Sequence, residues 1–196
     1  DVEDGIYTIV AENDTRSDSV GVIVSGGKVI EPTGSIELVL ENGQTTSVEY
    51  KTPNTPQVIV RGLNNIFKDT TNYGSDEDQS IIDQGGWIEF CMEVSSIDAS
   101  EVPVDDMKLI QKNVKNNETI AMYLDLSIYK RRYNLYGTMV DETNVSAING
   151  NLQINITVPI STELASKNGL DVIRVHESTV ERLGGNVLPT KDAYSF

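Results

Sequence analysis

The chain has very few of the residues on which many enzymes and metal proteins rely. Its 196 residues include one cysteine, Cys91, one histidine, His176, and one tryptophan, Trp87. A single cysteine excludes an intrachain disulfide and any metal site built from several cysteines. A nucleophile activated by a histidine base would have to use His176, and no G-x-S-x-G elbow is present. We therefore expect no catalytic residues.

Basic residues and long apolar runs are also scarce. Lys and Arg number 15 against 30 Asp and Glu, which gives a formal net charge of −15. Nucleic-acid binding depends mainly on Lys and Arg that replace counterions, so we expect no nucleic-acid partner. No apolar run reaches the roughly 20 residues that span a bilayer, so we expect no membrane insertion. The acidic excess favours a soluble, solvated surface.

What the sequence does contain is apolar residues at every second position, the pattern of strands with one buried face. Residues 87–94, 120–128 and 151–160 alternate most strictly. In residues 87–94 the pattern places Glu89 and Glu93 on the solvent side. The apolar positions of the three segments are Ile88, Phe90, Met92, Val94, Ile120, Met122, Leu124, Leu126, Ile128, Leu152, Ile154, Ile156, Val158 and Ile160. These segments predict half-solvated antiparallel sheets.

Shorter strands separated by turn residues are predicted before residue 63. Asn42-Gly43 lies between two of them and predicts a tight type I′ hairpin. Short strands at this spacing are typical of sandwiches and barrels, not of parallel sheets with crossover helices. The predicted strands are residues 5–11, 20–24, 35–40, 45–50 and 57–61.

The remaining segments set the predicted domain boundaries. Residues 104–114 follow helical spacing after Pro103, with acids in the first turn, and a shorter helix is predicted at 162–166. Residues 64–85 are rich in Asn, Asp, Ser and Gly and are interpreted as a loop or linker. The sequence thus predicts an all-β fold of two tandem antiparallel sandwich modules, 1–63 and 86–196, joined by 64–85.

Acidic pairs are the candidates for a metal site. Asp76 and Asp78 lie in a glycine-containing segment and offer the hard oxygen ligands that Ca²⁺ prefers, as do Asp105-Asp106 and Asp141-Glu142. No EF-hand loop pattern is present, and the alternative is a solvated acidic loop. A structural Ca²⁺ ion at Asp76 and Asp78 is the only cofactor considered.

Aromatic residues on the polar sides of strands are the candidates for a ligand site. Trp87, Tyr123 and Tyr129 could stack on sugar rings, or could stabilise cross-strand pairing instead. Cys91 fits a buried strand position. A Lys–Asn isopeptide bond that involves Lys51, Lys130, Asn151 or Asn155 is a further alternative, which the sequence alone cannot pair.

Three segments from residue 86 onward carry a resemblance to a known family. Residues 87–94 lead into Asp105-Asp106-Met107-Lys108, and residues 123–130 read YLDLSIYK, close to the family's YLDISLYK. Residues 172–177 read VIRVHE, close to its V-x-R-V-H-[DE]-G. This part of the chain resembles a module, often repeated, of large surface-anchored proteins of Gram-positive bacteria (Firmicutes).

The resemblance implies an Ig-like or fibronectin-like β-sandwich that acts as a spacer or adhesion unit, with no catalytic residues to transfer. Ser178 stands where the family usually has a turn glycine. The family pattern also continues past Phe196 into one more strand, so we expect the module at 86–196 to lack its last strand or to receive it from another chain.

These observations favour a non-catalytic structural or adhesive module of a secreted or cell-surface bacterial protein. Its expected partners are neighbouring modules of the same polypeptide and a host or cell-wall glycan or protein. Two alternatives remain open at this point. One is a carbohydrate-binding module of a secreted glycan-active protein, and the other is a virion or appendage component assembled by strand donation.

Overall fold

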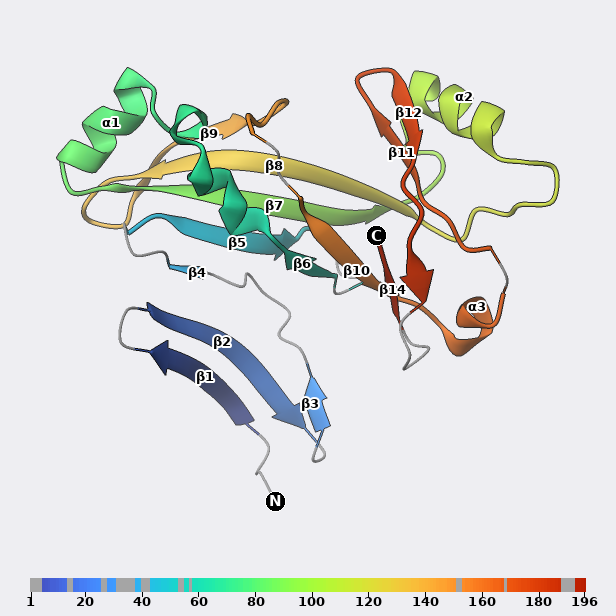
Figure 1. The fold of residues 1–196 in the computed structure, drawn as a ribbon, viewed down its shortest axis with the longest axis horizontal. Helices are drawn as coiled ribbons and strands as arrows, with labels where there is room; N and C mark the ends of the chain where they lie inside the picture. The colour runs from blue at the N-terminus through green and yellow to red at the C-terminus, as the bar shows by residue number, and fades with distance from the viewer. Residues whose placement is uncertain are drawn as a thin grey trace. The chain divides into compact units, whose positions relative to one another are not determined.

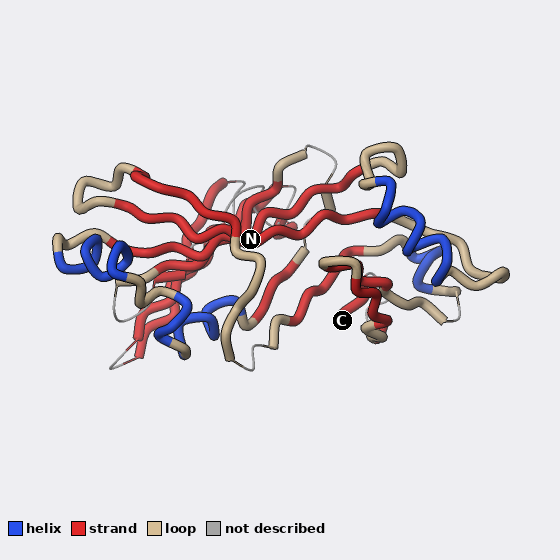
Figure 2. The backbone as a smooth tube through the Cα atoms, turned by 90° about the horizontal axis from the view of Figure 1, so that it is seen from above, coloured by secondary structure: helices blue, strands red, loops and turns tan. Residues whose placement is uncertain are grey.

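The computed structural model describes residues 5–13, 16–25, 28–30, 38–39, 43–52, 55–56, 58–150, 153–167, 169–187 and 193–196, with the backbone alone before residue 43. Strands arranged in sheets dominate, and the helices are few and short (Figures 1 and 2). The fold is therefore β-rich, as the alternating pattern predicts. Two compact units form, and each draws on separated parts of the chain. The first takes residues 1–51, 61–94 and 126–154, and the second takes 52–60, 95–125 and 155–196.

A three-stranded antiparallel sheet contains the first strands of the chain. Strand β1 (Gly5–Asn13) pairs with β2 (Arg16–Ser25), and β2 pairs with β3 (Lys28–Ile30). The β1–β2 register runs from Gly5 opposite Val24 to Asn13 opposite Arg16. The strands predicted at 5–11 and 20–24 lie within β1 and β2, and both predictions are confirmed.

The largest sheet of the first unit has the strand order β4-β5-β7-β8-β9 (Figure 1). The elements are β4 (Leu38–Val39), β5 (Thr45–Tyr50), β7 (Trp87–Ile97), β8 (Tyr123–Tyr133) and β9 (Met139–Asn144). Val39 pairs with Thr45, whereas a two-residue hairpin at Asn42-Gly43 requires Val39 opposite Thr46, so the register of the predicted hairpin is wrong. Asn42 itself lies outside the described residues.

Strands β5 and β7 pair in parallel, with Thr45 opposite Glu89 and Tyr50 opposite Val94. The prediction of a purely antiparallel architecture is wrong at this pair. Parallel neighbours need a connection of a dozen or more residues. Residues 51–86 provide it and contain β6 (Ile59–Arg61), two 3-10 helices, η1 (Leu63–Lys68) and η2 (Thr70–Asn72), and helix α1 (Asp76–Asp83).

The segment predicted as a linker, 64–85, is therefore largely helical and connects two strands of one sheet. Helix α1 begins with a capping box, in which the Ser75 hydroxyl accepts from the backbone N–H of Asp78 and the Asp78 carboxylate accepts from the backbone N–H of Ser75. Acids in a first helical turn also interact favourably with the helix dipole. The same Asp-rich composition that resembles a loop thus starts a helix here.

The apolar core of the first unit lies on one face of β7. Ile88, Phe90 and Val94 have no solvent-exposed area, and the Phe67 ring of η1 packs edge-on against Phe90 with 5.1 Å between centroids. Leu63 and Ile66 of η1 are buried as well. The apolar face predicted for residues 88–94 is confirmed, and η1 supplies the side chains of the connection that are buried with it.

The second unit contains a sheet of order β13-β14-β10-β6 and a separate hairpin of β11 (Ile173–His176) and β12 (Thr179–Arg182). Strand β14 (Ala193–Ser195) pairs antiparallel with β10 (Asn155–Pro159) and with β13 (Asn186–Val187). Residues near the end of the chain thus form a central strand of this sheet. The additional strand expected from the resemblance stays a prediction.

Helix α2 (Val104–Asn113) contacts the β11–β12 hairpin, and α3 (Thr162–Ala165) follows β10. The helices predicted at 104–114 and 162–166 are confirmed. Strand β8 begins at Tyr123, three residues later than the predicted strand, and Met122 is 38% exposed. The prediction that Met122 lies on a buried strand face is therefore wrong.

Candidate functional site

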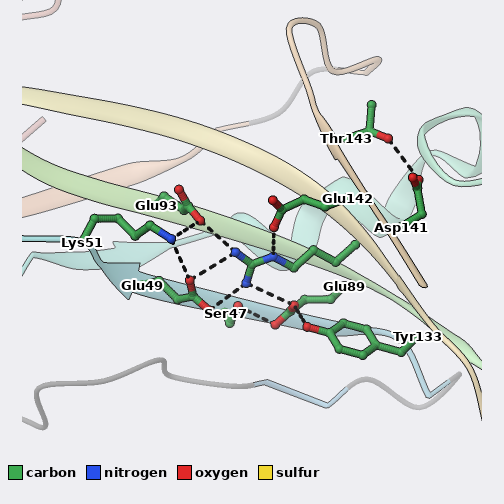
Figure 3. A network of polar contacts seen from close by, with 10 residues as sticks. Ser47, Glu49, Lys51, Glu89, Glu93, Tyr133, Asp141, Glu142 and Thr143 are labelled. Atoms are coloured by element: carbon green, nitrogen blue, oxygen red, sulfur yellow. Dashed lines mark hydrogen bonds and ion pairs between the residues drawn. The ribbon is translucent and has the colours of Figure 1, made fainter. Parts of the chain in front are cut away.

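The most concentrated group of charged side chains surrounds Arg131 of β8. The side chain of Arg131 is only 7% exposed. Its guanidinium Nη1 and Nη2 donate to the Glu49 carboxylate of β5 at 2.7 and 3.1 Å, and Nη2 also donates to Glu93 of β7 at 2.8 Å. The Nε–H donates to Glu142 of β9 at 2.6 Å. Each strand that flanks β8, and β5 beyond β7, thus contributes a carboxylate to one cation (Figure 3).

A second set of contacts extends this cluster along β5 and β7. Glu89 lies 3.6 Å from Arg131 and accepts hydrogen bonds from the Ser47 hydroxyl at 2.6 Å and the Tyr133 hydroxyl at 2.9 Å. The Lys51 ammonium contacts Glu93 at 2.8 Å (Figure 3). We call the whole group the Arg131 cluster; its members are Ser47, Glu49, Lys51, Glu89, Glu93, Arg131, Tyr133 and Glu142.

Strand alternation and register explain how the sequence assembles the cluster. Ser47 and Glu49 occupy alternate positions of β5, so their side chains share one face of the sheet, and Lys51 follows directly after the strand. The parallel register places Glu49 opposite Glu93, and the antiparallel register of β8 and β9 places Arg131 opposite Glu142. These two registers therefore place Glu49 beside Glu93 and Glu142 beside Arg131.

The cluster contains four carboxylates and two cations, and these charges shift the pKa values of Glu49 and Arg131. Hydrogen bonds from Arg131 lower the pKa of Glu49 and outweigh the opposing effect of its burial. Burial works against the charge of Arg131, but hydrogen bonds to Glu49 and Glu142 outweigh it and raise the pKa of the guanidinium. Burial and the hydrogen bond to Glu89 raise the pKa of Tyr133 to about 12. A general acid or base works best with a pKa near the working pH. The pKa shifts of Glu49 and Tyr133 instead move away from neutral pH, so the Glu49 carboxylate is charged and the Tyr133 hydroxyl is neutral near pH 7.

The prediction that Glu89 and Glu93 lie on a solvated face is wrong. Glu89 is 8% exposed, and the side chain of Glu93 is 13% exposed. Between them Cys91 is fully buried, and burial raises the pKa of its thiol to about 12, consistent with the predicted inert strand position. One signal in the sequence could have revealed the cluster: Lys130-Arg131-Arg132, three cations in succession within a strand of an otherwise acidic chain.

The cations on either side of Arg131 project to the opposite face and bind a predicted metal ligand. The Asp78 side chain has no exposed area, and its two oxygens lie 2.7 Å from Lys130 and 2.7 Å from Arg132. Burial alone would raise the pKa of Asp78, but these two hydrogen bonds outweigh it and lower the pKa. Asp78 is thus a helix-capping residue that neutralises two cations, whereas Asp76 is exposed at the start of α1. Among the described residues no group of three or more His, Cys, Asp and Glu could hold a metal ion.

The predicted aromatic ligand residues do not form one platform. The Trp87 ring stacks on Tyr133 with 5.0 Å between centroids and 7° between planes, so one ring face is occupied. Tyr129 is half-buried in β8 opposite Asn144. Tyr123 belongs to the second unit, where its hydroxyl lies 4.0 Å from the sulfur of Met107. Sugar binding by Trp87, Tyr123 and Tyr129 stays a prediction.

The remaining predicted residues are placed as follows. His176 lies on the exposed edge of β11, opposite Thr179. Lys51 and Lys130 form the ion pairs described above, and Asn155 accepts a hydrogen bond from the Ser195 hydroxyl at 2.8 Å. Asn151 lies outside the described residues. An isopeptide bond stays a prediction.

Among the described residues, no helix has both the length and the apolar composition needed to cross a membrane. Comparison of the chain with family models, with curated proteins and with solved structures found no match.

Proposed function

We propose that the chain is a non-catalytic structural or adhesive module of a secreted or cell-surface bacterial protein, and that 86–196 is related to Ig-like surface modules. The Arg131 cluster is the observation on which the proposal depends. Its arginine donates hydrogen bonds to carboxylates of β5, β7 and β9 at once, so its charged groups connect neighbouring strands. Such groups stabilise a sheet and are poorly placed to exchange protons with a substrate.

The composition and the fold support the same proposal. An acidic exterior, a β-rich fold and the segments YLDLSIYK and VIRVHE are all expected of a surface module.

The most direct test uses antibodies against the chain on cells of the organism that makes it. We expect labelling of intact cells that brief treatment with an external protease removes. Labelling that requires permeabilised cells would contradict the proposed location.

A separate assay tests the non-catalytic part of the proposal. The purified chain is incubated with chromogenic glycosides, esters and peptides over a range of pH. We expect no turnover above that of the Arg131→Met variant, in which the charged cluster is broken. Turnover by the wild-type chain that the variant loses, while it remains folded, would assign the cluster to catalysis.

Carbohydrate binding is retained as a second candidate because one aromatic ring is unusually exposed. Tyr136, in the β8–β9 turn, is 84% exposed, and Leu135 beside it is 54% exposed. Trp87→Ala is a poor test because the variant also loses the stack on Tyr133. Tyr136→Ala removes an exposed ring without that loss. Glycan-array binding that disappears in Tyr136→Ala would favour this candidate over a purely structural module.

A further inference from the structure

Among the described residues, no further strand pairs with the outer edge of the five-stranded sheet at β9. Strand β9 is the last strand in the order β4-β5-β7-β8-β9, and all six of its residues are exposed. The Val145 N–H donates to the Ile128 carbonyl at 2.8 Å, which identifies that pair as hydrogen-bonded. Hydrogen-bonded and non-hydrogen-bonded pairs alternate in an antiparallel ladder. Glu142, opposite Arg131, and Asn144, opposite Tyr129, therefore direct their N–H and C=O groups away from β8.

The side chains at this edge form an acidic, partly apolar border. Asp76, Glu77, Ser80, Ile81, Arg132, Val140 and Asp141 line an open hollow of about 590 Å³ between α1 and β9. Asp141 pairs with Arg132, whereas Asp76 and Glu77 are exposed. The apolar part of the border continues through Met139 and Val140, which are 48% and 51% exposed. A strand placed beside β9 would direct every second side chain toward this hollow, where acids and apolar groups lie together.

We propose that the open edge of β9 binds an extended, basic segment of another protein, which extends the sheet by one strand. Main-chain hydrogen bonds to Glu142 and Asn144 would supply the pairing. Lys or Arg side chains on the face of the bound strand that points to α1 would lie near Asp76 and Glu77, and their aliphatic stems would cover Val140 and Ile81.

Charge distinguishes this partner from a second copy of the same chain. Two β9 strands placed side by side would bring Asp141 and Glu142 of one copy near the same acids of the other. Like charges opposite each other destabilise strand pairs. The chain also carries a formal charge of −15, which opposes self-association and favours a basic partner. The inference does not depend on the proposed cell-surface location.

The test uses the full chain and two capped eight-residue peptides, one alternating Lys with Val and the other alternating Glu with Val. Binding is followed by calorimetry and by amide hydrogen exchange in the presence of each peptide. We expect the basic peptide to bind and to slow exchange at Glu142 and Asn144. We expect exchange at Thr143, whose amide already faces β8, to be unchanged. Protection at another edge instead, or equal binding of the acidic peptide, would overturn the proposal.

Variants provide the matched controls. Asn144→Pro removes one outward N–H and leaves the pairing of β9 with β8 intact, so we expect a wild-type urea midpoint and about tenfold weaker binding. Glu77→Lys and Glu163→Lys make the same charge change in the first turns of α1 and α3. We expect only Glu77→Lys to weaken binding several-fold. Equal effects of the two charge reversals would indicate non-specific attraction and overturn the assignment to β9. If Asn144→Pro does not fold, the wild-type chain still tests the proposal, because the basic peptide must slow amide exchange at Glu142 and Asn144.

Discussion

Two arginines of this chain each bind several carboxylates, but in different surroundings. Arg131 lies in the middle of a sheet with its side chain 7% exposed, and its partners come from three other strands. Arg182, at the end of β12, is 28% exposed. It contacts Glu118 at 2.7 Å, Asp171 at 2.6 Å and the Asn113 carbonyl at 2.5 Å, all in loops or at the end of α2.

The difference lies in solvent access more than in the number of contacts. Water and salt screen an exposed ion pair, whose contribution to stability is usually small. A buried pair is costly to desolvate, so removal of one partner leaves uncompensated charges in the interior. We therefore expect the Arg131 cluster to determine whether the five-stranded sheet is stable, and Arg182 to orient the β11–β12 hairpin against α2.

Removal of Arg131 is expected to have the largest effect. Arg131→Met leaves Glu49, Glu89, Glu93 and Glu142 without their shared cation, and we expect a loss of about 3–5 kcal/mol in the free energy of unfolding. Urea unfolding followed by Trp87 fluorescence measures it. Arg174→Met, at a side chain 51% exposed, is the control with the same change. Similar losses in the two variants would contradict the comparison.

The second-largest effect is expected from acid, which weakens the ion pairs of the Arg131 cluster. The pKa of Glu49 is lowered in the folded state, so its contribution is present above the ordinary pKa of 4.5. This contribution is lost as pH falls below 4.5 toward the lowered pKa, because the unfolded state then binds more protons. We expect Glu49→Gln to be less stable than wild type at pH 7 and the two stabilities to converge as the pH falls below 4.5. A constant difference from pH 7 to pH 3 would show that ionisation of Glu49 is unimportant.

A smaller, stabilising change is expected in the hairpin that ends in Arg182. Glu177 and Ser178 form the β11–β12 turn with φ of 46° and 66°, which non-glycine residues adopt at a cost. Ser178→Gly removes the strain at one position, and we expect a gain of about 0.5–1 kcal/mol after the entropy cost of glycine. Thermal unfolding measures the gain. Destabilisation by Ser178→Gly would show that the serine side chain contributes to the turn.

Removal of Arg182 is expected to have the smallest effect. Hydrogen bonds from Arg182 lower the pKa of Glu118 to about 2, but both side chains are partly exposed. We expect Arg182→Met to destabilise the protein much less than Arg131→Met, and this loss to shrink further at about 1 M NaCl because salt screens exposed pairs. Faster amide exchange confined to the β11–β12 hairpin would accompany it. A loss that salt does not change would place Arg182 with the buried pairs.

The sequence predicts the strands and helices of this fold better than their pairing. Alternation identifies β7 and places Ile88, Phe90 and Val94 in the core, because burial of one strand face requires a period of two. The parallel pairing of β5 with β7 depends on a connection of residues 51–86, whose acids and asparagines resemble a linker. A local pattern does not distinguish a solvated segment from one that forms short capped helices.

The Arg131 cluster could not be predicted from the alternation for a related reason. A polar residue on a strand indicates the face opposite the apolar core, and that face is usually solvated in antiparallel sheets. Here Glu89 and Glu93 form ion pairs with Arg131 of β8, and all three side chains are buried together. The acidic segment predicts Asp78 as a metal ligand because the cations that neutralise it, Lys130 and Arg132, lie on β8, distant in sequence.

Exchange of the arginine side-chain Nε protons with water tests the central claim most directly. Both Arg131 and Arg182 can be observed in one ¹⁵N spectrum of the native protein. We expect the Nε proton of Arg131, which donates to Glu142 inside the sheet, to exchange at least about tenfold more slowly than that of Arg182. Equal exchange rates would contradict a buried, fully paired cluster.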